Sequence, residues 1–392
     1  MTSVDDWRGR AEELRAELVS AGKLASFEWQ AAVTAVPRHK FVPEFFQRGA
    51  GGWELVSARD PGTRDRWLKA VYANTSLVTR IGEVPDGGRD RTGPTSSASA
   101  PGLMTRMLEA LDLRAGDRVL EIGTGTGYNA ALLSHRLGDD NVYSVDIDPD
   151  LVDGAAANLR ALGYRPTLAV ADGADGFPGH GPYERIIATC AVPRVPWSWA
   201  EQTVVGGLVL VDVKVHAVVG NLVLLRRYAD RLEGRFDPGN ATFMQIRSQA
   251  FHLELPGPPV RDRQTARQRT TSVSAERLWE NAPLWFLLHL IEPGRVEFGF
   301  AADPQGGIGP EFYTGRDGSW CEVTSADGGA REVWEGGPRS LWSSIEAAVK
   351  SWTELGMPGW DRFGLTVRSA EEQVVWLDQP TSPHRWTLVR SR

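Results

Sequence analysis

The stretch from Val119 to Leu133, VLEIGTGTGYNAALL, sets three glycines between a short apolar run and a helical pattern. A glycine-rich turn between a strand and a helix is typical of nucleotide-binding sheets, because the missing side chains let the backbone approach a ligand. Enzymes that use nicotinamide or flavin cofactors can carry a similar turn. A turn of this kind can also do no more than pack a helix on a strand. Residues outside the turn therefore have to decide between these alternatives.

Three acidic positions at predicted strand ends favour S-adenosylmethionine as the ligand of the turn. Glu121 stands two residues before the first glycine, where dinucleotide enzymes usually have an apolar residue, and the Gly-x-Gly-x-Gly spacing is too short for their pyrophosphate loop. Asp146 ends the second strand in YSVDID, where a carboxylate can accept both ribose hydroxyls. Asp172 and Gly173 end the run VADG, which is well placed to reach the adenine amino group. Ligands of such sheets bind at the carboxyl ends of the strands, so these residues are expected at one site.

Strand and helix patterns alternate around this turn. The apolar runs RVLEIG, NVYSVDID, PTLAVAD, RIIATC and GLVLVDV are the strand candidates, and helical stretches follow the first two. This alternation predicts an α/β fold, a doubly wound Rossmann-like domain whose parallel sheet is covered on both faces. The runs NLVLLRRY and ATFMQIR are expected to close one edge as a hairpin. The methyltransferase domain, with its N-terminal helices, is predicted over residues 1–250.

The segments before and after this core differ from it. Residues 7–18 and the segment after Ser26 are expected to be helices, the second ending near Val36 because Pro37 disfavours helix in the preceding residue. Residues 82–101 are rich in Gly, Pro and Ser and predict a long loop.

The chain beyond residue 250 is rich in tryptophan, and nine of the fifteen lie there. Residues 251–275 are predicted to be a linker, and residues 276–392 a smaller α+β domain for substrate recognition. In it an amphipathic helix over 340–356 is expected, with RFGLTV, EQVVWLD and HRWTLVR as strands around it. The tryptophans are expected to serve core packing rather than a ligand cage.

Bulk properties exclude several classes of function. A net charge of -7 and an isoelectric point near 5.6 argue against a nucleic-acid or anionic-membrane partner. Two cysteines cannot form a disulfide framework, and no run has the length of a signal peptide or membrane span, so a cytoplasmic protein is expected. The seven histidines are scattered, and no metal site is predicted.

Further motifs resemble the protein L-isoaspartyl O-methyltransferases over roughly residues 25–250. AVPRHKFVPE (35–44) is similar to that family's VPRHxFVP signature, and SSASAP (96–101) to its Thr-x-Ser-x-Pro loop. VLEIGTGTGY is similar to its cofactor loop, VADG to its adenine contact, and ATCAVPRVP (188–196) to its small-residue strand end. The resemblance implies S-adenosylmethionine as cofactor and a peptide or protein carrying aspartate or isoaspartate as methyl acceptor.

On this resemblance Ser99 takes the position of the active-site serine. Its hydroxyl can donate to the acceptor carboxylate, and no strong base is needed, because that carboxylate is already ionised at neutral pH. Catalysis is then mainly alignment. The alternative is that the serines at 96, 97 and 99 are solvated loop residues. The implied cofactor-binding residues are Ser97, Glu121, Gly123, Thr124, Gly125, Gly127, Asp146, Ile147, Asp172 and Gly173.

Two departures from the repair enzymes point to a specialised substrate: the Trp-rich extension, and the stretch 67–82 with the insertion EVPDGGRDRTGPTSS (83–97), which replaces a compact entrance. The arrangement resembles the actinobacterial branch associated with ribosomally made peptides, including lanthipeptides and graspetides or imiditides. That resemblance implies methylation of a chosen aspartate in a cyclised precursor peptide. The next backbone amide then attacks the ester and leaves an aminosuccinimide or, after hydrolysis, isoaspartate.

General isoaspartyl repair and a non-catalytic peptide-binding adaptor are the alternatives. The intact set of acidic and glycine positions disfavours the adaptor. A small-molecule methyltransferase would leave AVPRHKFVPE unexplained.

Overall fold

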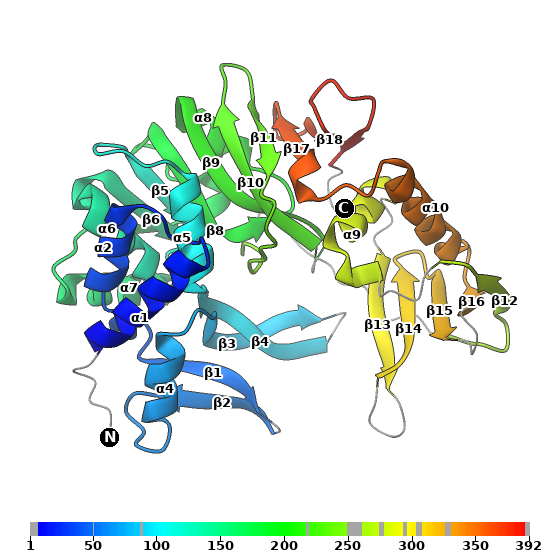
Figure 1. Cartoon of the computed structure of the whole chain (residues 1–392), viewed down its shortest axis with the longest axis horizontal. Helices are drawn as coiled ribbons and strands as arrows, with labels where there is room; N and C mark the ends of the chain where they lie inside the picture. Colours follow the sequence, from blue (N-terminus) through cyan, green and yellow to red (C-terminus); the bar gives the residue numbers. More distant parts are fainter. Residues whose placement is uncertain are drawn as a thin grey trace.

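A ten-stranded sheet with the order β19-β18-β17-β11-β10-β9-β8-β5-β6-β7 forms the centre of the protein (Figure 1). The computed structural model describes residues 7–49, 51–86, 89–216, 219–248, 261–273, 278–292, 296–302, 308–325 and 331–388. The strands are β5 (Val119–Ile122), β6 (Val142–Asp146), β7 (Thr167–Val170), β8 (Tyr183–Val192), β9 (Thr203–His216), β10 (Val219–Arg227), β11 (Leu232–Phe236), β17 (Phe363–Val367), β18 (Gln373–Leu377) and β19 (Arg385–Thr387). Strands β5 to β9 pair in parallel and the rest antiparallel. All five strands predicted for the parallel sheet are confirmed.

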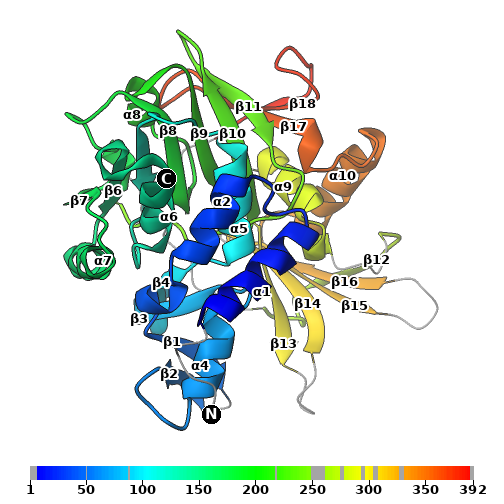
Figure 2. The same cartoon turned by 60° about the vertical axis from the view of Figure 1, so that its left-hand side comes forward.

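Helices cover both faces of the parallel half, as the predicted doubly wound fold requires (Figure 2). The helices of this part are α1 (Trp7–Ser20), α2 (Phe27–Ala35), α5 (Pro101–Ala110), α6 (Tyr128–Leu137), α7 (Pro149–Ala161) and α8 (Trp197–Glu201). Helices α6 and α7 contact β6, α8 contacts β9, and α1 packs on α2, which packs on α6. Successive side chains of β9 enter different cores, because a strand's side chains alternate between faces. Leu208 and Leu210 pack in the core that includes α1, α2, α5 and α6, whereas Val209 and Val211 pack in the other.

The predicted loop over 82–101 is wrong, because most of it is a β-hairpin. Strands β3 (Leu77–Asp86) and β4 (Arg89–Ala98) pair antiparallel, and with β1 (Glu44–Gly49) and β2 (Gly52–Ser57) they form a sheet of order β2-β1-β3-β4. The short helices α3 (Arg38–Phe41) and α4 (Arg64–Val71) belong to this region. Glycine and proline indicated a loop, but strand pairing to a distant segment overrides local propensity. Gly82 faces Gly93 across the hairpin, and a Cβ at Gly93 would lie 2.6 Å from Val84 Cγ2.

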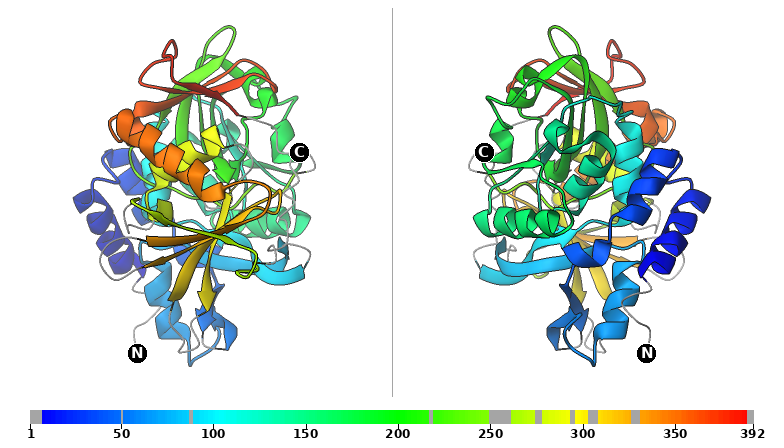
Figure 3. Two further views of the ribbon diagram at one scale, coloured as in Figure 1. Left: turned by 90° about the vertical axis from the view of Figure 1, so that its right-hand side faces the viewer. Right: turned by 90° about the vertical axis from the view of Figure 1, so that its left-hand side faces the viewer.

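A third sheet, with five strands in the order β12-β16-β15-β14-β13, lies in the C-terminal part (Figure 3). Its strands are β12 (Arg267–Thr271), β13 (Val296–Ala302), β14 (Ile308–Gly315), β15 (Trp320–Ser325) and β16 (Arg331–Gly336), and α9 (Ala282–Ile291) and α10 (Leu341–Glu354) accompany them. The predicted helix over 340–356 is confirmed as α10. Of the C-terminal tryptophans, Trp285, Trp320, Trp342, Trp360 and Trp376 are buried, with at most 4% exposure, so they serve packing as expected. The side chain of Trp279 lies outside the described residues.

The sheets do not follow the expected division of the chain. Strands β17 to β19 form as predicted, but β17 pairs with β11 and extends the central sheet instead of surrounding α10. Strand β12 falls within the expected linker 251–275, of which residues 251–260 and 274–275 lie outside the described residues. The expected strand ATFMQIR is also wrong. β11 completes the hairpin with β10, and residues 241–248 form no strand and make one isolated β-bridge to the sheet, Ala191 with Gln245. No helix within the described ranges is long and apolar enough to cross a membrane.

Candidate active site

A cavity of about 1550 Å³ lies at the carboxyl ends of β5, β6 and β8. Its wall combines the glycine turn, the end of β4, the end of β9, residues 240–248 and Ala282 at the start of α9. The predicted site residues that line it are Ser97, Ser99, Glu121, Gly123, Thr124, Gly125, Asp146, Ile147 and Gly173. The fold therefore brings nine of the eleven predicted residues to one cavity, while Gly127 and Asp172 lie outside its lining.

The glycine turn adopts a backbone that other residues rarely tolerate. Gly123, Gly125 and Gly127 have φ values of 97°, 51° and 86°. A Cβ at Gly123 would lie 2.8 Å from Thr189 Oγ1, whereas one at Gly125 would meet only Ser97 O, at 3.9 Å. The middle glycine thus leaves open space in the cavity, as a turn that cradles a ligand requires. Gly127 instead packs helices, because its Cβ would lie 3.0 Å from Ala155 Cβ on α7.

Glu121 lies beneath the turn and is almost fully buried. Its Oε1 accepts from Asn129 Nδ2 at 2.7 Å, and its Oε2 accepts from Ser144 Oγ at 2.6 Å. The Ser144 hydroxyl also contacts Thr124 Oγ1 at 2.8 Å, which ties the carboxylate to the turn. Burial raises the pKa of Glu121 to about 7. At neutral pH this carboxyl group therefore stands near its midpoint, and a cationic ligand group in the cavity would favour its ionised form.

Asp146 ends β6 at the cavity, where a ribose-binding carboxylate was predicted. Its Oδ2 accepts from the main-chain N–H of Gly125 at 3.0 Å, and its Oδ1 from that of Asp148 at 3.2 Å. Arg247 Nη2 lies 3.9 Å from Asp146 Oδ1. The carboxylate is thus fixed against the turn that it serves. Its contact with a ribose remains a prediction.

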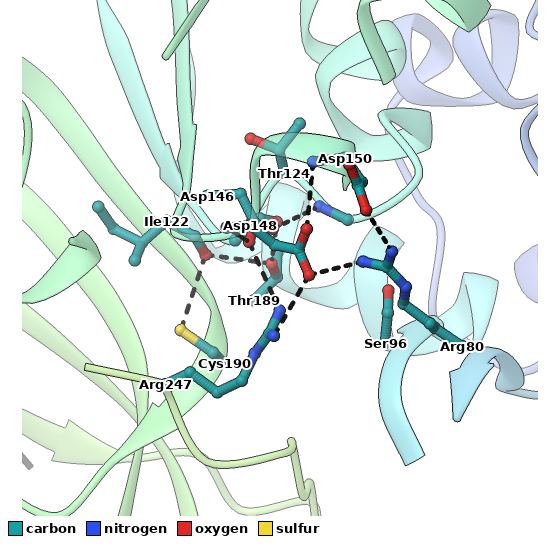
Figure 4. A network of polar contacts seen from close by, with 12 residues as sticks. Arg80, Ser96, Ile122, Thr124, Asp146, Asp148, Asp150, Thr189, Cys190 and Arg247 are labelled. Carbon is teal, nitrogen blue, oxygen red and sulfur yellow. Dashed lines mark hydrogen bonds and ion pairs between the residues drawn. The ribbon is translucent and has the colours of Figure 1, made fainter. Parts of the chain in front are cut away.

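An ion-pair network that the sequence did not indicate surrounds this carboxylate (Figure 4). Arg80 of β3 contacts Asp148 Oδ2 through Nη1 at 2.6 Å and Asp150 Oδ2 through Nη2 at 2.7 Å. Arg247 contacts the same Asp148 oxygen at 3.3 Å. The network ties the hairpin of Ser97 to the start of α7. Arg80 and Arg247 are far from the two aspartates in sequence, so no local pattern indicated these ion pairs.

Arg38, the arginine of AVPRHKFVPE, hydrogen-bonds to the main chain of the serine loop, which is the segment SSASAP (96–101). Its guanidinium is fully buried and donates to the main-chain carbonyl of Ser99 at 3.0 Å and of Thr75 at 3.2 Å. It also donates to the carbonyls of Val71, Ala73 and Ala98. Burial lowers the pKa of Arg38 to about 10, so it stays charged at neutral pH. The motif therefore has a structural role here, since it fixes the backbone that carries the candidate catalytic serine.

Asp172, the predicted adenine contact, hydrogen-bonds to other residues of the protein. Asp172 Oδ1 caps the following turn by accepting from the N–H of Ala174 at 3.0 Å, and Oδ2 accepts from Ser248 Oγ at 2.8 Å. Gly173 does line the cavity, and a Cβ there would lie 2.5 Å from Ile122 Cγ2. Binding of an adenine amino group by Asp172 remains a prediction, because Asp172 is not among the residues that line the cavity.

Two charged residues of the apolar strand β9 were not predicted as site residues. Asp212 is fully buried, and Lys214 lines the cavity with 8% of its surface exposed. Their signal was present in the sequence as two charges within the apolar run VLVDVKV.

Comparison with known proteins agrees with this geometry. The family model for protein-L-isoaspartate(D-aspartate) O-methyltransferase matches residues 66–236. A protein-L-isoaspartate O-methyltransferase of Ignicoccus hospitalis is 33% identical over 207 residues, which are 52% of this chain and 82% of that relative. A namesake from Methanosarcina mazei is 34% identical over 184 residues, 46% of this chain and 62% of the relative.

A solved structure named protein-L-isoaspartate O-methyltransferase resembles the present one in fold, with a TM-score of 0.53 and 23% identity. That likeness covers 94% of this chain and 100% of the other, so it extends into the C-terminal part.

Proposed function

This chain belongs to the protein-L-isoaspartate O-methyltransferase family, and we propose that it methylates a chosen aspartate side chain in a ribosomally made, cyclised precursor peptide. It is a carboxyl methyltransferase, and its cofactor is S-adenosylmethionine, which supplies a methyl group on a cationic sulfur. The residues present fit that cofactor. Gly125 leaves the cavity open at the turn, and Asp146 presents a fixed carboxylate beside it. Among the alternatives, general isoaspartyl repair is the one that the relatives' names favour.

The chain's own part in the reaction is mainly positional. We assign Ser99 to the acceptor, whose carboxylate its hydroxyl orients by donating a hydrogen bond. Arg38 fixes the Ser99 main chain through its carbonyl, so the hydroxyl starts from a defined backbone. Since the acceptor carboxylate is ionised at neutral pH, no residue has to remove a proton from it.

The size and walls of the cavity carry the proposal of a peptide substrate. Sites for small ligands usually measure about 300–1000 Å³, and this cavity holds about 1550 Å³. Part of its wall comes from Glu83, Val84 and Thr95 of the β3–β4 hairpin, and Ala282 contributes from beyond the family match. Selecting one aspartate in one peptide needs contacts beyond a single carboxylate, because that group alone discriminates little.

The C-terminal part by itself does not separate peptide modification from repair. A solved structure named protein-L-isoaspartate O-methyltransferase shares the overall fold across 94% of this chain. Support for peptide modification therefore rests on the room beside the cofactor turn and on the hairpin that borders it.

A direct comparison of substrates tests the proposal. The full-length protein is given S-adenosylmethionine with a cyclised precursor peptide from its own gene neighbourhood, the linear form of that peptide, and a set of unrelated isoaspartyl peptides. We expect fast methylation of the cyclised peptide, seen by mass spectrometry as gain of one CH₂ unit. Attack by the next backbone amide then expels methanol, which leaves the peptide one water lighter than at the start. Ser99→Ala is the control for chemistry at this site. Efficient methylation of every isoaspartyl peptide would make the protein a general repair enzyme, and no methylation of any substrate would favour the adaptor.

A further inference from the structure

A buried cation in the cavity wall has no role in the chemistry above. Lys214 lies near the end of β9, lines the cavity and is 8% exposed. Its backbone pairs with Gly220 of β10 at a bulge, and a Cβ at Gly220 would lie 2.5 Å from Lys214 Cγ. The glycine thus makes room for the lysine stem.

The Lys214 ammonium is only partly satisfied. Its hydrogen bond goes to the carbonyl of Phe243, and within the described ranges it forms no ion pair. Asp212 attracts it from the same strand, but Asp212 Oδ2 accepts from the N–H of Phe243 at 2.8 Å and its Oδ1 has no hydrogen bond. A buried ammonium with unused donors is costly unless an anion completes its surroundings. Burial accordingly lowers the pKa of Lys214.

The order of the strands indicates whether an anion at Lys214 would come from the cofactor or from the methyl acceptor. In the order β10-β9-β8-β5-β6-β7, β9 lies two strands from β5 and on the side away from β6, which ends at Asp146. Neighbouring strands are about 4.8 Å apart, so β9 runs about 10 Å from the strand that leads into the glycine turn. Residues 240–248, which border the cavity, lie directly beside Lys214 through Phe243. An anion at Lys214 is therefore placed on the acceptor side of the cofactor turn.

We propose that Lys214 binds a second carboxylate of the acceptor peptide, distinct from the one that is methylated. This inference rests on the proposed function. The reacting carboxylate needs a free lone pair directed at the cationic methyl group, which suits the neutral Ser99 hydroxyl better than an ammonium. The second carboxylate is either an acidic side chain near the acceptor or the peptide's C-terminal carboxylate. Lys214 then selects peptides by charge at a fixed distance from the acceptor aspartate.

Matched peptides with one acceptor test this role. The template is the peptide that the full-length protein methylates best, made with glutamate or glutamine near the acceptor and with a free or amidated C-terminus. In the wild-type protein we expect kcat/KM to be about 10- to 150-fold higher for the charged member of one pair, the usual range for a hydrogen bond to a charged group. The pair that shows this ratio identifies the source of the carboxylate.

In Lys214→Met, which keeps an apolar stem beside Gly220, we expect that ratio to fall to about 1, because only the charged peptide loses its ion-pair partner. Lys69→Met removes an exposed charge from α4 and should leave the ratio unchanged. Equal loss for charged and neutral peptides in Lys214→Met would mean a structural role and overturn the proposal.

Should Lys214→Met fail to fold, the wild-type measurement can still overturn the inference. A wild-type protein that methylates peptides without any charge preference overturns the inference about Lys214 alone. A protein that methylates no peptide at all instead contradicts the proposed function.

Discussion

Replacing Asp146 with alanine is expected to weaken S-adenosylmethionine binding by about 1.5–3 kcal/mol, or about 10- to 150-fold in Kd. The carboxylate lies at the cavity and is held by the N–H groups of Gly125 and Asp148 at 3.0 and 3.2 Å. Ribose hydroxyls that donate to it would form charge-assisted bonds, whose loss gives this range. Alanine also leaves the two main-chain donors without their acceptor, which should cost about 1–3 kcal/mol of folding free energy.

Isothermal calorimetry with S-adenosylmethionine measures the affinity, and chemical denaturation measures the stability separately. Asp148→Ala is a matched control, because it removes the same charge from the same network while keeping the Asp146–Gly125 contact. Asp148 caps α7 by accepting from Asp150 N–H and pairs with Arg80. Its loss should therefore lower stability by about 1 kcal/mol and change the Kd little. Unchanged affinity in Asp146→Ala, or equal weakening in both variants, would refute the assignment of Asp146 to the ribose.

Three other variants probe the serine loop and the buried acid. Ser99→Ala should keep cofactor affinity and lose most methyl transfer, measured by initial rates; wild-type turnover would show that Ser99 is only a loop residue. Arg38→Lys cannot reach all the carbonyls that the guanidinium holds, so denaturation should show a loss of about 2–4 kcal/mol, with a lower kcat at unchanged cofactor Kd. Glu121 has a pKa of about 7 in the folded protein against 4.5 as its ordinary value, so the folded state binds more protons between these values and stability falls as pH rises through that window. The free energy of unfolding should fall by up to about 3 kcal/mol from pH 4.5 to pH 7 through this group, and Glu121→Gln should remove that part of the pH dependence.

The cofactor turn could be predicted from the sequence because its conformation depends on neighbouring residues, and the glycine pattern is also local. Glycines at alternate positions dictate the backbone of the turn directly, and a carboxylate at the end of a parallel strand lies at the site whatever the rest of the chain does. For this reason Gly123, Gly125 and Asp146 all line the cavity. Gly127 has the required positive φ, yet its contact is with Ala155, so spacing alone did not reveal which glycines face the ligand.

Features that depend on distant pairing could not be derived in this way. Strand β17 pairs with β11 more than a hundred residues earlier, and no local pattern records that partner. The glycines and prolines of β3 and β4 led to the prediction of a loop. The two segments nevertheless pair as antiparallel strands. The bridge from Arg80 to Asp148 joins segments that only the folded chain brings together.

The residues proposed for methyl transfer differ from those proposed to select the peptide. Aspartate and isoaspartate each offer one ionised carboxylate, and the turn, Asp146 and Ser99 would treat both alike, because alignment with the cationic methyl group is all that transfer needs. A preference between them must therefore come from groups that contact the rest of the peptide. Around this cavity those groups include the β3–β4 hairpin, residues 240–248 and Lys214. They line the cavity with side chains, whereas the glycine turn lines it with main-chain atoms. Changes at Lys214 should consequently alter which peptide is methylated, whereas changes at Asp146 and Ser99 should lower methylation of every peptide.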